Sequence, residues 1–349
     1  MDIKIQPIET SKINSVDFSN LAFGHVFTDH MFICSYANGE WKNPEIVPYG
    51  PIAFEPSARV FHYGQAVFEG MKAYKDDSDD IFLFRPDESI KRLNKSAERL
   101  AMPALPEEFF YEGLKKLLHI DTSWIKKGFG NSLYIRPFMI ATEGAIAASP
   151  AKEYKFIIIC SPAQSYYAGE VRVVIAEKYS RSADGGVGFA KAAGNYAAQF
   201  YPTSLAQKEG YQQVIWTDAN THEFLEEAGT MNVFFRIGDT LVTAPVNDRI
   251  LDGITRKSII QLAKDSGVTV EVRNITVTEI KEAATKGELK EIFGSGTAAV
   301  INPIKGFKHQ DFTYELPELE NAYATVFKEK LMNIQYNKDT DVHNWRVKV

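Results

Sequence analysis

Residues 185–198 read GGVGFAKAAGNYAA, a run of small side chains that contains a single lysine, Lys191. Glycine and alanine let another group come close to the backbone, and glycine tolerates the backbone angles that such an approach requires. An amine among small apolar residues is poorly hydrated, which favours the neutral form that attacks carbonyl carbons. The stretch therefore predicts Schiff-base chemistry at Lys191, although most lysines in such loops are simply solvated.

The size and composition of the chain predict a two-domain protein that acts on a small molecule. With 349 residues it exceeds the usual size of a single core, and its 45% hydrophobic and 24% charged residues are ordinary for globular domains. We expect a small N-terminal domain over residues 1–163, a linker over 164–171 and a larger domain over 172–349. The net charge of -6 comes from interspersed acids and bases, which argues against nucleic acid or an anionic membrane as the partner.

Targeting, membrane and metal signals are not found in the sequence. The start MDIKIQPIETSKINS lacks the pattern of a secretory signal, so we expect a cytoplasmic location. The apolar run 156–160 is far shorter than the ~20 residues of a membrane helix and predicts a buried strand. Cys34 and Cys160 are expected to be reduced core thiols. No HExxH motif or Cys/His cluster predicts a metal site.

Hydrophobic patterning predicts a mixed α/β architecture. In the N-terminal half, β-branched and aromatic residues favour strands, while residues 87–103 have helical spacing, with Asp87 as the expected cap and Pro103 as the stop. A new strand is expected to begin at Val171, where we place the domain boundary. The predicted strands cover 27–36, 66–75, 81–86, 156–160, 171–180, 212–218, 230–237, 240–245 and 268–275. Further helices are predicted to begin near Ser204, Gly253 and Thr278, and to cover 319–331.

Two segments could bind a phosphate. One is the helix start at Ile254 and Thr255, where backbone N–H groups lack partners within the helix. The other is GSGTAA at 294–299, where two glycines and Thr297 could form a nest of N–H donors or an ordinary turn. Neither segment matches a P-loop, and GGVGFAK does not complete GxGxxG. Glu227, two residues before Gly229, could equally be a solvated surface acid.

Seven ordered segments together change this assessment, because along nearly the whole chain they resemble one family. The chain resembles the branched-chain amino-acid aminotransferases, in particular their longer form, which are fold type IV enzymes dependent on pyridoxal 5'-phosphate. The resemblance implies two α/β domains with the cofactor at their interface, and a homodimer. It is carried by FGHVFTDHMF (23–32), FHYGQAVFEGMKAY (61–74), FRPDESIKRL (84–93), GGVGFAKAAGNYAAQF (185–200), EEAGTMNVFF (226–235), LDGITRKSI (251–259) and GSGTAA (294–299).

The resemblance also implies roles in cofactor binding. Lys191 matches the catalytic lysine, which holds the cofactor as a Schiff base and moves a proton at the substrate α-carbon. Tyr196 matches the tyrosine at the cofactor phenolate oxygen, and Glu227 the carboxylate at the pyridine nitrogen. The remaining implied cofactor contacts are Arg92, Ile254, Thr255 and Thr297 at the phosphate, and Arg181 as a further arginine of the site.

For the substrate, the resemblance implies an apolar pocket for leucine, isoleucine or valine. The α-carboxylate is expected near Tyr63 and the backbone of Thr297 and Ala298, and Arg136 is expected to receive the distal carboxylate of glutamate or 2-oxoglutarate. The expected lining is Phe23, Phe68, Tyr134, Tyr166 and Thr230, with Ala148 supplied by the partner subunit. Many of these aromatic residues could instead be ordinary core. The CxxC pair of some longer relatives is replaced by Ala299 and Asn302, which excludes redox control by that pair.

Two alternatives to this function remain open. A D-amino-acid aminotransferase or an aminodeoxychorismate lyase of the same fold would keep Lys191 and Glu227 and differ in the substrate pocket. A non-catalytic cofactor-binding protein is the alternative from another class, and the intact Lys191, Tyr196 and Glu227 argue against it.

Overall fold

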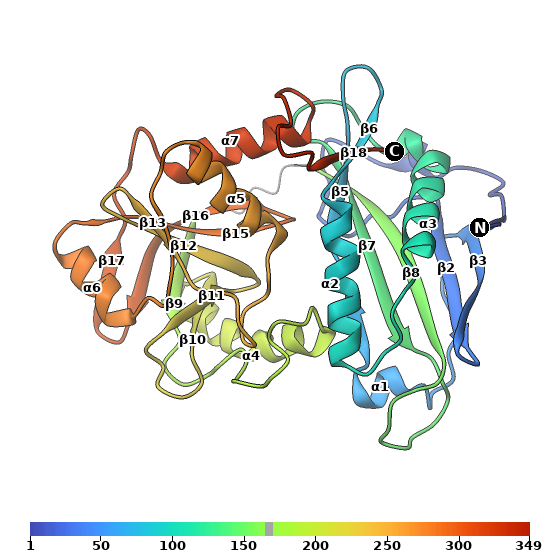
Figure 1. The fold of residues 1–349 in the computed structure, drawn as a ribbon, viewed down its shortest axis with the longest axis horizontal. Coiled ribbons are helices and arrows are strands. Elements are labelled where there is room, and N and C mark those ends of the chain that lie inside the picture. Colours follow the sequence, from blue (N-terminus) through green and yellow to red (C-terminus); the bar gives the residue numbers. More distant parts are fainter. Residues whose placement is uncertain (165–169) are drawn as a thin grey trace. The chain divides into compact units, whose positions relative to one another are not determined.

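The computed structural model describes residues 1–164 and 170–349, which form two compact units (Figure 1). Unit 1 contains the described residues up to 164 together with Ala190–Gly194 and Ile334–Val349. Unit 2 contains residues 170–189 and Asn195–Asn333. The short segment around Lys191 therefore belongs to unit 1, while the residues on either side of it belong to unit 2.

Unit 1 is built on one large sheet whose centre is the antiparallel pair β7 and β8. Strand β8 carries the apolar run 156–160 and is buried along most of its length. Strand β4 (Ala66–Phe68) also pairs with β7. The order across the sheet is β1 (Lys4–Ile5), β3 (Glu40–Pro48), β2 (His30–Ala37), β8 (Tyr154–Ala163), β7 (Ser132–Ala141), β5 (Met71–Lys75), β6 (Ile81–Phe84) and β18 (Arg346–Lys348).

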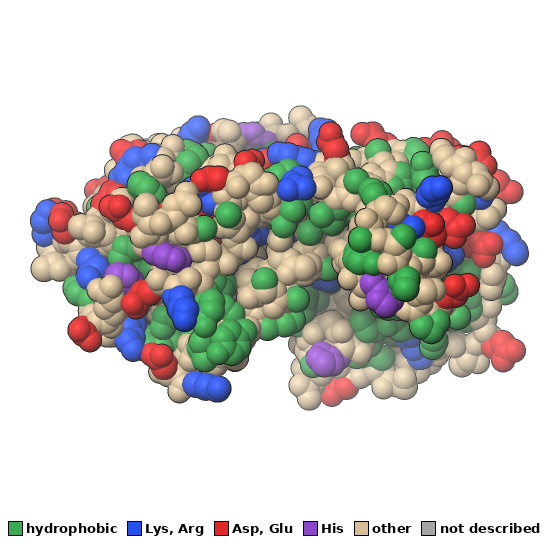
Figure 2. All heavy atoms as spheres, turned by 90° about the horizontal axis from the view of Figure 1, so that it is seen from below, with side chains coloured by type: hydrophobic (Ala, Val, Ile, Leu, Met, Phe, Trp, Pro, Cys, Tyr) green, Lys and Arg blue, Asp and Glu red, His purple; other side chains and the backbone are tan. Residues whose placement is uncertain are grey.

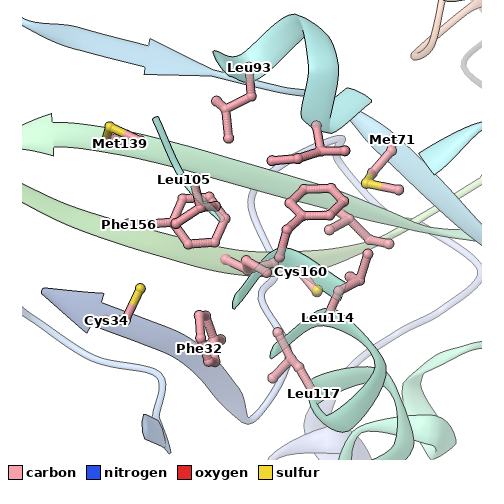
Figure 3. Packing of buried hydrophobic residues seen from close by; sticks show 14 of the residues in the cluster. Phe32, Cys34, Met71, Leu93, Leu105, Leu114, Leu117, Met139, Phe156 and Cys160 are labelled. Atoms are coloured by element: carbon pink, nitrogen blue, oxygen red, sulfur yellow. The ribbon is translucent and has the colours of Figure 1, made fainter. Parts of the chain in front are cut away.

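The core of unit 1 lies between this sheet and the helices α2 (Pro86–Arg99) and α3 (Glu107–Ile120), as Figure 3 shows. Leu93 of α2 and Leu114 of α3 are fully buried against the sheet. Gly113 allows α3 to approach β2, because a Cβ at this position would lie 2.8 Å from the ring of Phe32. The short α1 spans Arg59–Tyr63, and single 3-10 turns cover Ile13–Ser15 and Thr122–Trp124.

Unit 2 contains a closed ring of strands, in the order β11, β10, β9, β16, β15 and β12. The pairing of β11 with β12 closes the ring, and this closure sets Glu227 opposite Asn232. The strands of this unit are β9 (Val171–Ile175), β10 (Gln213–Thr217), β11 (Leu225–Ala228), β12 (Met231–Ile237), β13 (Thr240–Thr243), β14 (Val270–Val272), β15 (Leu289–Gly296), β16 (Val300–His309) and β17 (Phe312–Glu315). The remaining helices are α4 (Ala193–Lys208), α5 (Ile254–Asp265), α6 (Val277–Thr285) and α7 (Tyr323–Gln335).

Several expected boundaries were wrong. Helix α4 begins at Ala193 instead of near Ser204, although it contains Gly194 and Pro202, which disfavour helix in isolation. The C-terminal helix begins at Tyr323, four residues later than predicted. Asp87 is not the cap of α2, because the helix already begins at Pro86, after Arg85 in the left-handed conformation.

The surface and the cysteines agree with the composition. Acidic and basic side chains are interspersed on the face shown in Figure 2. Cys34 and Cys160 are buried free thiols, as predicted, and burial raises the pKa of Cys34 to about 12. Within residues 1–164 and 170–349, no helix has the length and hydropathy needed to cross a bilayer. The same residues contain no group of His, Cys, Asp or Glu side chains placed to hold a metal ion.

Candidate functional site

The main chain of Lys191 is held from both sides within unit 1. Its N–H donates to Ser96 Oγ of α2 at 2.9 Å, and its carbonyl accepts from the Phe68 N–H of β4 at 3.1 Å. The Lys191 Nζ lies 4.8 Å from the centroid of the Phe68 ring. The predicted nucleophile is thus fixed by two elements of regular structure instead of lying on a free loop.

Arg92 is anchored by a buried carboxylate that the sequence did not reveal. Its Nε donates to Glu69 Oε1 at 2.7 Å and its Nη2 donates to Glu69 Oε2 at 2.8 Å, a two-point contact that fixes the guanidinium plane. Glu69 has no exposed surface, and Arg92 is 9% exposed. Glu69 follows β4 directly, so Arg92 and Lys191 are both tied to the same stretch of chain.

Four of the predicted substrate residues lie together in unit 1. The rings of Phe23 and Tyr134 meet edge to face with centroids 4.9 Å apart, and the Arg136 guanidinium lies 4.6 Å from the Phe68 centroid. Arg136 Nη2 also donates to the Tyr134 hydroxyl at 2.9 Å. Gly70 makes room for this arrangement, because a Cβ there would lie only 2.3 Å from the Tyr134 hydroxyl oxygen. The result is an aromatic cluster that holds the Arg136 guanidinium.

Tyr63, a further substrate candidate, contacts the loop that carries another candidate, Ala148. Tyr63 of α1 donates from its hydroxyl to the Ile146 carbonyl, and Ala148 is exposed in the same loop. Arg59 ties this loop to α1, because its Nη1 donates to the Ser149 carbonyl. Tyr166 lies outside the described residues.

In unit 2, Glu227 is a deeply buried carboxylate with three neighbours. Arg181 Nε lies 2.8 Å from Glu227 Oε2, and both side chains are less than 5% exposed. Glu227 Oε1 accepts from Asn232 Nδ2 at 3.0 Å and from the Leu251 N–H at 3.2 Å. Glu227 is therefore not the solvated surface acid that the sequence left open. These contacts hold the carboxylate in one orientation.

Asn232 connects Glu227 to the start of α5. Its Nδ2 donates to the Leu251 carbonyl at 2.9 Å, and a Cβ on Gly253 would lie 1.9 Å from its Oδ1. Gly253 is the N-cap of α5 and makes no side-chain cap, so Ile254 and Thr255 present backbone N–H groups at the start of the helix. Such a helix start fits a phosphate group.

Thr297 and Ala298 lie in the loop between β15 and β16, where the sequence allowed either a nest or a turn. Gly294 lies within β15, opposite Asn302, and its φ is not positive. A Cβ on Gly294 would lie 2.6 Å from Met231 Cε, so close packing explains this glycine. Residues 297–299 form the turn of this hairpin, with Gly296 and Val300 paired at its ends. Thr230, one residue before β12, is exposed.

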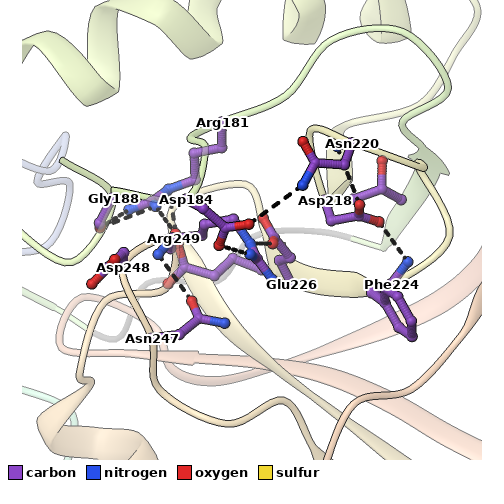
Figure 4. Close-up of polar contacts among 12 residues, drawn as sticks. Arg181, Asp184, Gly188, Asp218, Asn220, Phe224, Glu226, Asn247, Asp248 and Arg249 are labelled. Carbon is purple, nitrogen blue, oxygen red and sulfur yellow. Dashed lines mark hydrogen bonds and ion pairs between the residues drawn. The ribbon is translucent and has the colours of Figure 1, made fainter. Parts of the chain in front are cut away.

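The stretch before Lys191 is held by a network around Arg249 (Figure 4). Arg249 pairs with Glu226 and with Asp184 through its guanidinium, while its carbonyl accepts from Arg181 Nη1 at 2.7 Å. Arg181 Nη1 and Nη2 also donate to the Gly188 carbonyl, both at 3.1 Å. Burial raises the pKa of Glu226, while Arg249 opposes this shift. Tyr196 lies in the first turn of α4.

The family model for class IV amino-transferases matches residues 66–307. The chain belongs to this class IV aminotransferase family. It is 46% identical to a probable branched-chain-amino-acid aminotransferase of Staphylococcus aureus, over 99% of this chain and 98% of the relative. It is 43% identical to branched-chain-amino-acid transaminase 1 of Bacillus subtilis, over 95% of both chains.

The fold comparison agrees with the sequence comparison. The crystal structure of the Escherichia coli branched-chain amino acid aminotransferase matches with a TM-score of 0.76 and 24% identity, over 91% of this chain and 98% of that one. The predicted resemblance, the fold type IV class and the expected aminotransferase activity are confirmed. Each unit of this class IV aminotransferase, taken by itself, offers groups that suit part of a phosphorylated aldehyde: unit 1 has a lysine whose main chain is fixed, and unit 2 has a buried carboxylate and a helix start without a side-chain cap.

Proposed function

We propose that this chain transfers the amino group of L-leucine, L-isoleucine or L-valine reversibly to 2-oxoglutarate. The observation that carries the proposal is the position of the Lys191 amine over Phe68, in the same cluster as Tyr134 and Arg136. A fixed amine beside apolar rings and one cation suits substrates that have an aliphatic or an acidic side chain. The relatives named branched-chain aminotransferases support this substrate class.

We propose pyridoxal 5'-phosphate as the cofactor. When bound, it supplies an aldehyde for the lysine and a ring that accepts electrons from the substrate α-carbon. Lys191 would attach it covalently and then, released by the incoming amino acid, carry the α-proton. The phosphate would be held by Arg92, by the backbone of Ile254 and Thr255, and by Thr297.

The ring would be held by two side chains. Glu227, held in place by Arg181 and Asn232, would retain a proton at the pyridine nitrogen. Tyr196 would donate a hydrogen bond to the phenolate oxygen. Arg181 acts through Glu227 in this proposal, because its guanidinium is already bonded to Glu227 and to two carbonyls.

Substrate selection is proposed for the aromatic cluster. Phe23, Phe68 and Tyr134 would pack on the aliphatic side chain, and Arg136 would bind the distal carboxylate of glutamate or 2-oxoglutarate. Tyr63 and the backbone of Thr297 and Ala298 would receive the α-carboxylate. Tyr166 and Thr230 remain predicted lining residues.

Three further predictions accompany this function. We propose a homodimer in which Ala148 of one protomer reaches the substrate of the other. The domain division at residues 164–171 is proposed to separate two parts that bind one cofactor. The cytoplasmic location stays a prediction from the sequence.

Lys191→Ala tests the proposed function. We expect loss of transamination between L-leucine and 2-oxoglutarate by more than about 10³-fold, because the attachment and the proton transfer both need this amine. Lys116→Ala, which removes an exposed lysine of α3 in the same unit, is the matched control and should keep full activity. Near-normal turnover by Lys191→Ala would contradict the proposal. If the wild-type enzyme converts D-amino acids and no L-amino acids, the D-amino-acid aminotransferase alternative is favoured.

A further inference from the structure

Ser96 lies at the centre of a closed circuit of contacts in unit 1. Its hydroxyl donates to the Arg92 carbonyl at 2.9 Å and its oxygen accepts from the Lys191 N–H at 2.9 Å. Arg92 binds Glu69 through two hydrogen bonds, and Glu69 is the covalent neighbour of Phe68. The Phe68 N–H donates a hydrogen bond to the Lys191 carbonyl at 3.1 Å. These contacts form a closed ring that begins and ends at the Lys191 main chain, so a shift of any one residue is resisted by the others.

The Ser96 hydroxyl has one fixed orientation in this circuit. Its proton is used by the Arg92 carbonyl of the preceding helical turn, which leaves its lone pairs directed at Lys191. Ser96 has no exposed surface, so water does not easily replace its oxygen as the acceptor. Without the hydroxyl, the Lys191 N–H loses this acceptor.

We propose that Ser96 is a positioning residue that sets the spacing between the Lys191 main chain and Arg92. This inference rests on the proposed function, in which Lys191 holds the aldehyde end and Arg92 the phosphate end of one rigid cofactor. Both ends are tied to α2, one through the Arg92 side chain and the other through Ser96. A displaced Lys191 main chain would leave the amine misplaced whenever the phosphate is correctly bound, and small misplacements of reacting groups cost large factors in rate.

The experiment compares Ser96→Ala with Ser89→Ala, which removes another buried serine from the same helix. Four properties of the holoenzyme are measured: hydrogen exchange of the peptide that contains Lys191, the dissociation constant of pyridoxal phosphate, the pH midpoint of the visible cofactor band, and kcat and KM for L-leucine. For Ser96→Ala we expect faster exchange at Lys191, a shifted midpoint, and cofactor binding weaker by roughly tenfold. We also expect kcat lower by roughly tenfold with KM within about twofold. Ser96→Thr, which keeps the hydroxyl, should restore most of kcat.

A purely structural role for Ser96 predicts a different result. Ser96→Ala would then lower the unfolding temperature, as Ser89→Ala does, and leave the pH midpoint, kcat and the exchange at Lys191 unchanged. That result would overturn the inference. If the alanine variant does not fold, Ser96→Cys gives the same readouts, because sulfur accepts hydrogen bonds weakly. A wild-type enzyme that fails to convert L-leucine would contradict the proposed function instead, so the two failures are distinguishable.

Discussion

A buried glutamate–arginine pair lies in each unit, Glu69–Arg92 in unit 1 and Glu227–Arg181 in unit 2, and the two pairs have opposite proposed roles. In unit 1, Glu69 holds Arg92, and the arginine is the group offered to the cofactor. In unit 2, Arg181 holds Glu227, and the carboxylate is the group offered. In both pairs, one partner holds the other in place.

A buried ion pair does not by itself show which of its two residues binds the cofactor. Removing one partner of such a pair is costly, because it leaves a buried charge uncompensated. The other contacts of each residue distinguish the cofactor-binding residue from its partner. Arg181 is also bonded to the carbonyls of Gly188 and Arg249, so its guanidinium has protein partners besides Glu227. Glu69 has no exposed surface and is bonded to both nitrogens of Arg92 that face it.

Of the substitutions that test this difference between the two pairs, Glu227→Gln should have the largest effect on activity. We expect kcat to fall by about 100-fold or more with little change in KM, because the negative charge at the pyridine nitrogen is lost. Glu226→Gln is the control, because it removes the adjacent buried carboxylate, which pairs with Arg249. Steady-state kinetics with L-leucine should show a much smaller loss of kcat in this control. Equal losses in both variants would mean that Glu227 is only structural.

Glu69→Gln should act mainly on cofactor binding. We expect the dissociation constant of pyridoxal phosphate to rise by about 10- to 30-fold, because Arg92 loses half of its two-point anchor. The unfolding free energy should fall by about 1 to 3 kcal/mol. Absorbance titration and urea unfolding measure the two effects. Glu98→Gln, at an exposed acid of α2, the helix that carries Arg92, should change neither. An unchanged dissociation constant in Glu69→Gln would separate Glu69 from the cofactor site.

Phe68→Ala should affect the substrate more than the cofactor. Loss of the ring is expected to lower kcat/KM for L-leucine by about 5- to 150-fold, because an apolar contact contributes roughly 1 to 3 kcal/mol to discrimination. Phe129→Ala, at a 53% exposed ring in the same unit, is the control. Unchanged leucine kinetics in Phe68→Ala would show that the aromatic cluster does not line the substrate site.

Asp218→Asn should have the smallest effect, and only on the pH dependence of stability. The pKa of Asp218 is lowered from 3.8 to about 2: burial opposes the shift, but hydrogen bonds from the backbone of Phe224, Thr221 and Glu223 outweigh it. Its stabilising effect is therefore fully present above the unfolded pKa near 3.8 and is lost as the pH falls towards 2.

Urea midpoints of the wild type and Asp218→Asn measure this effect. Their difference should be constant between about pH 5 and 7 and should shrink below about pH 5. A difference that does not depend on pH would contradict the lowered pKa. Asp218 lies in the loop between β10 and β11, and β11 carries Glu227. The result therefore also shows whether the negative charge of Asp218 stabilises the segment that precedes Glu227.

The elements with strong local patterns could be predicted from the sequence, and the contacts between them could not. Helix α2 was predicted because Ile90, Leu93 and Ala97 recur at helical spacing, and β8 because of its apolar run. Helix α4 was placed too late, because Gly194 and Pro202 weaken the local helical signal and tertiary structure outweighs it.

For the site as well, the residues in local motifs could be predicted from the sequence, and the contacts between elements could not. Lys191 and Glu227 stand in recognisable motifs, but their anchors depend on the fold. Asn232 reaches Glu227 only because β11 pairs with β12, and Ser96 reaches Lys191 only because residues 190–194 lie beside α2. For Ser96, the one sequence signal is its position four residues after Arg92, on the same face of a helix.

The most direct test of the central claim is the visible absorption of the purified protein, recorded before and after L-leucine is added and again after 2-oxoglutarate. We predict a cofactor band that bleaches with L-leucine and returns with 2-oxoglutarate, because the amino group passes to the protein-bound cofactor and then to the second substrate. A band that responds only to D-amino acids, or no band after pyridoxal phosphate is supplied, would contradict the account.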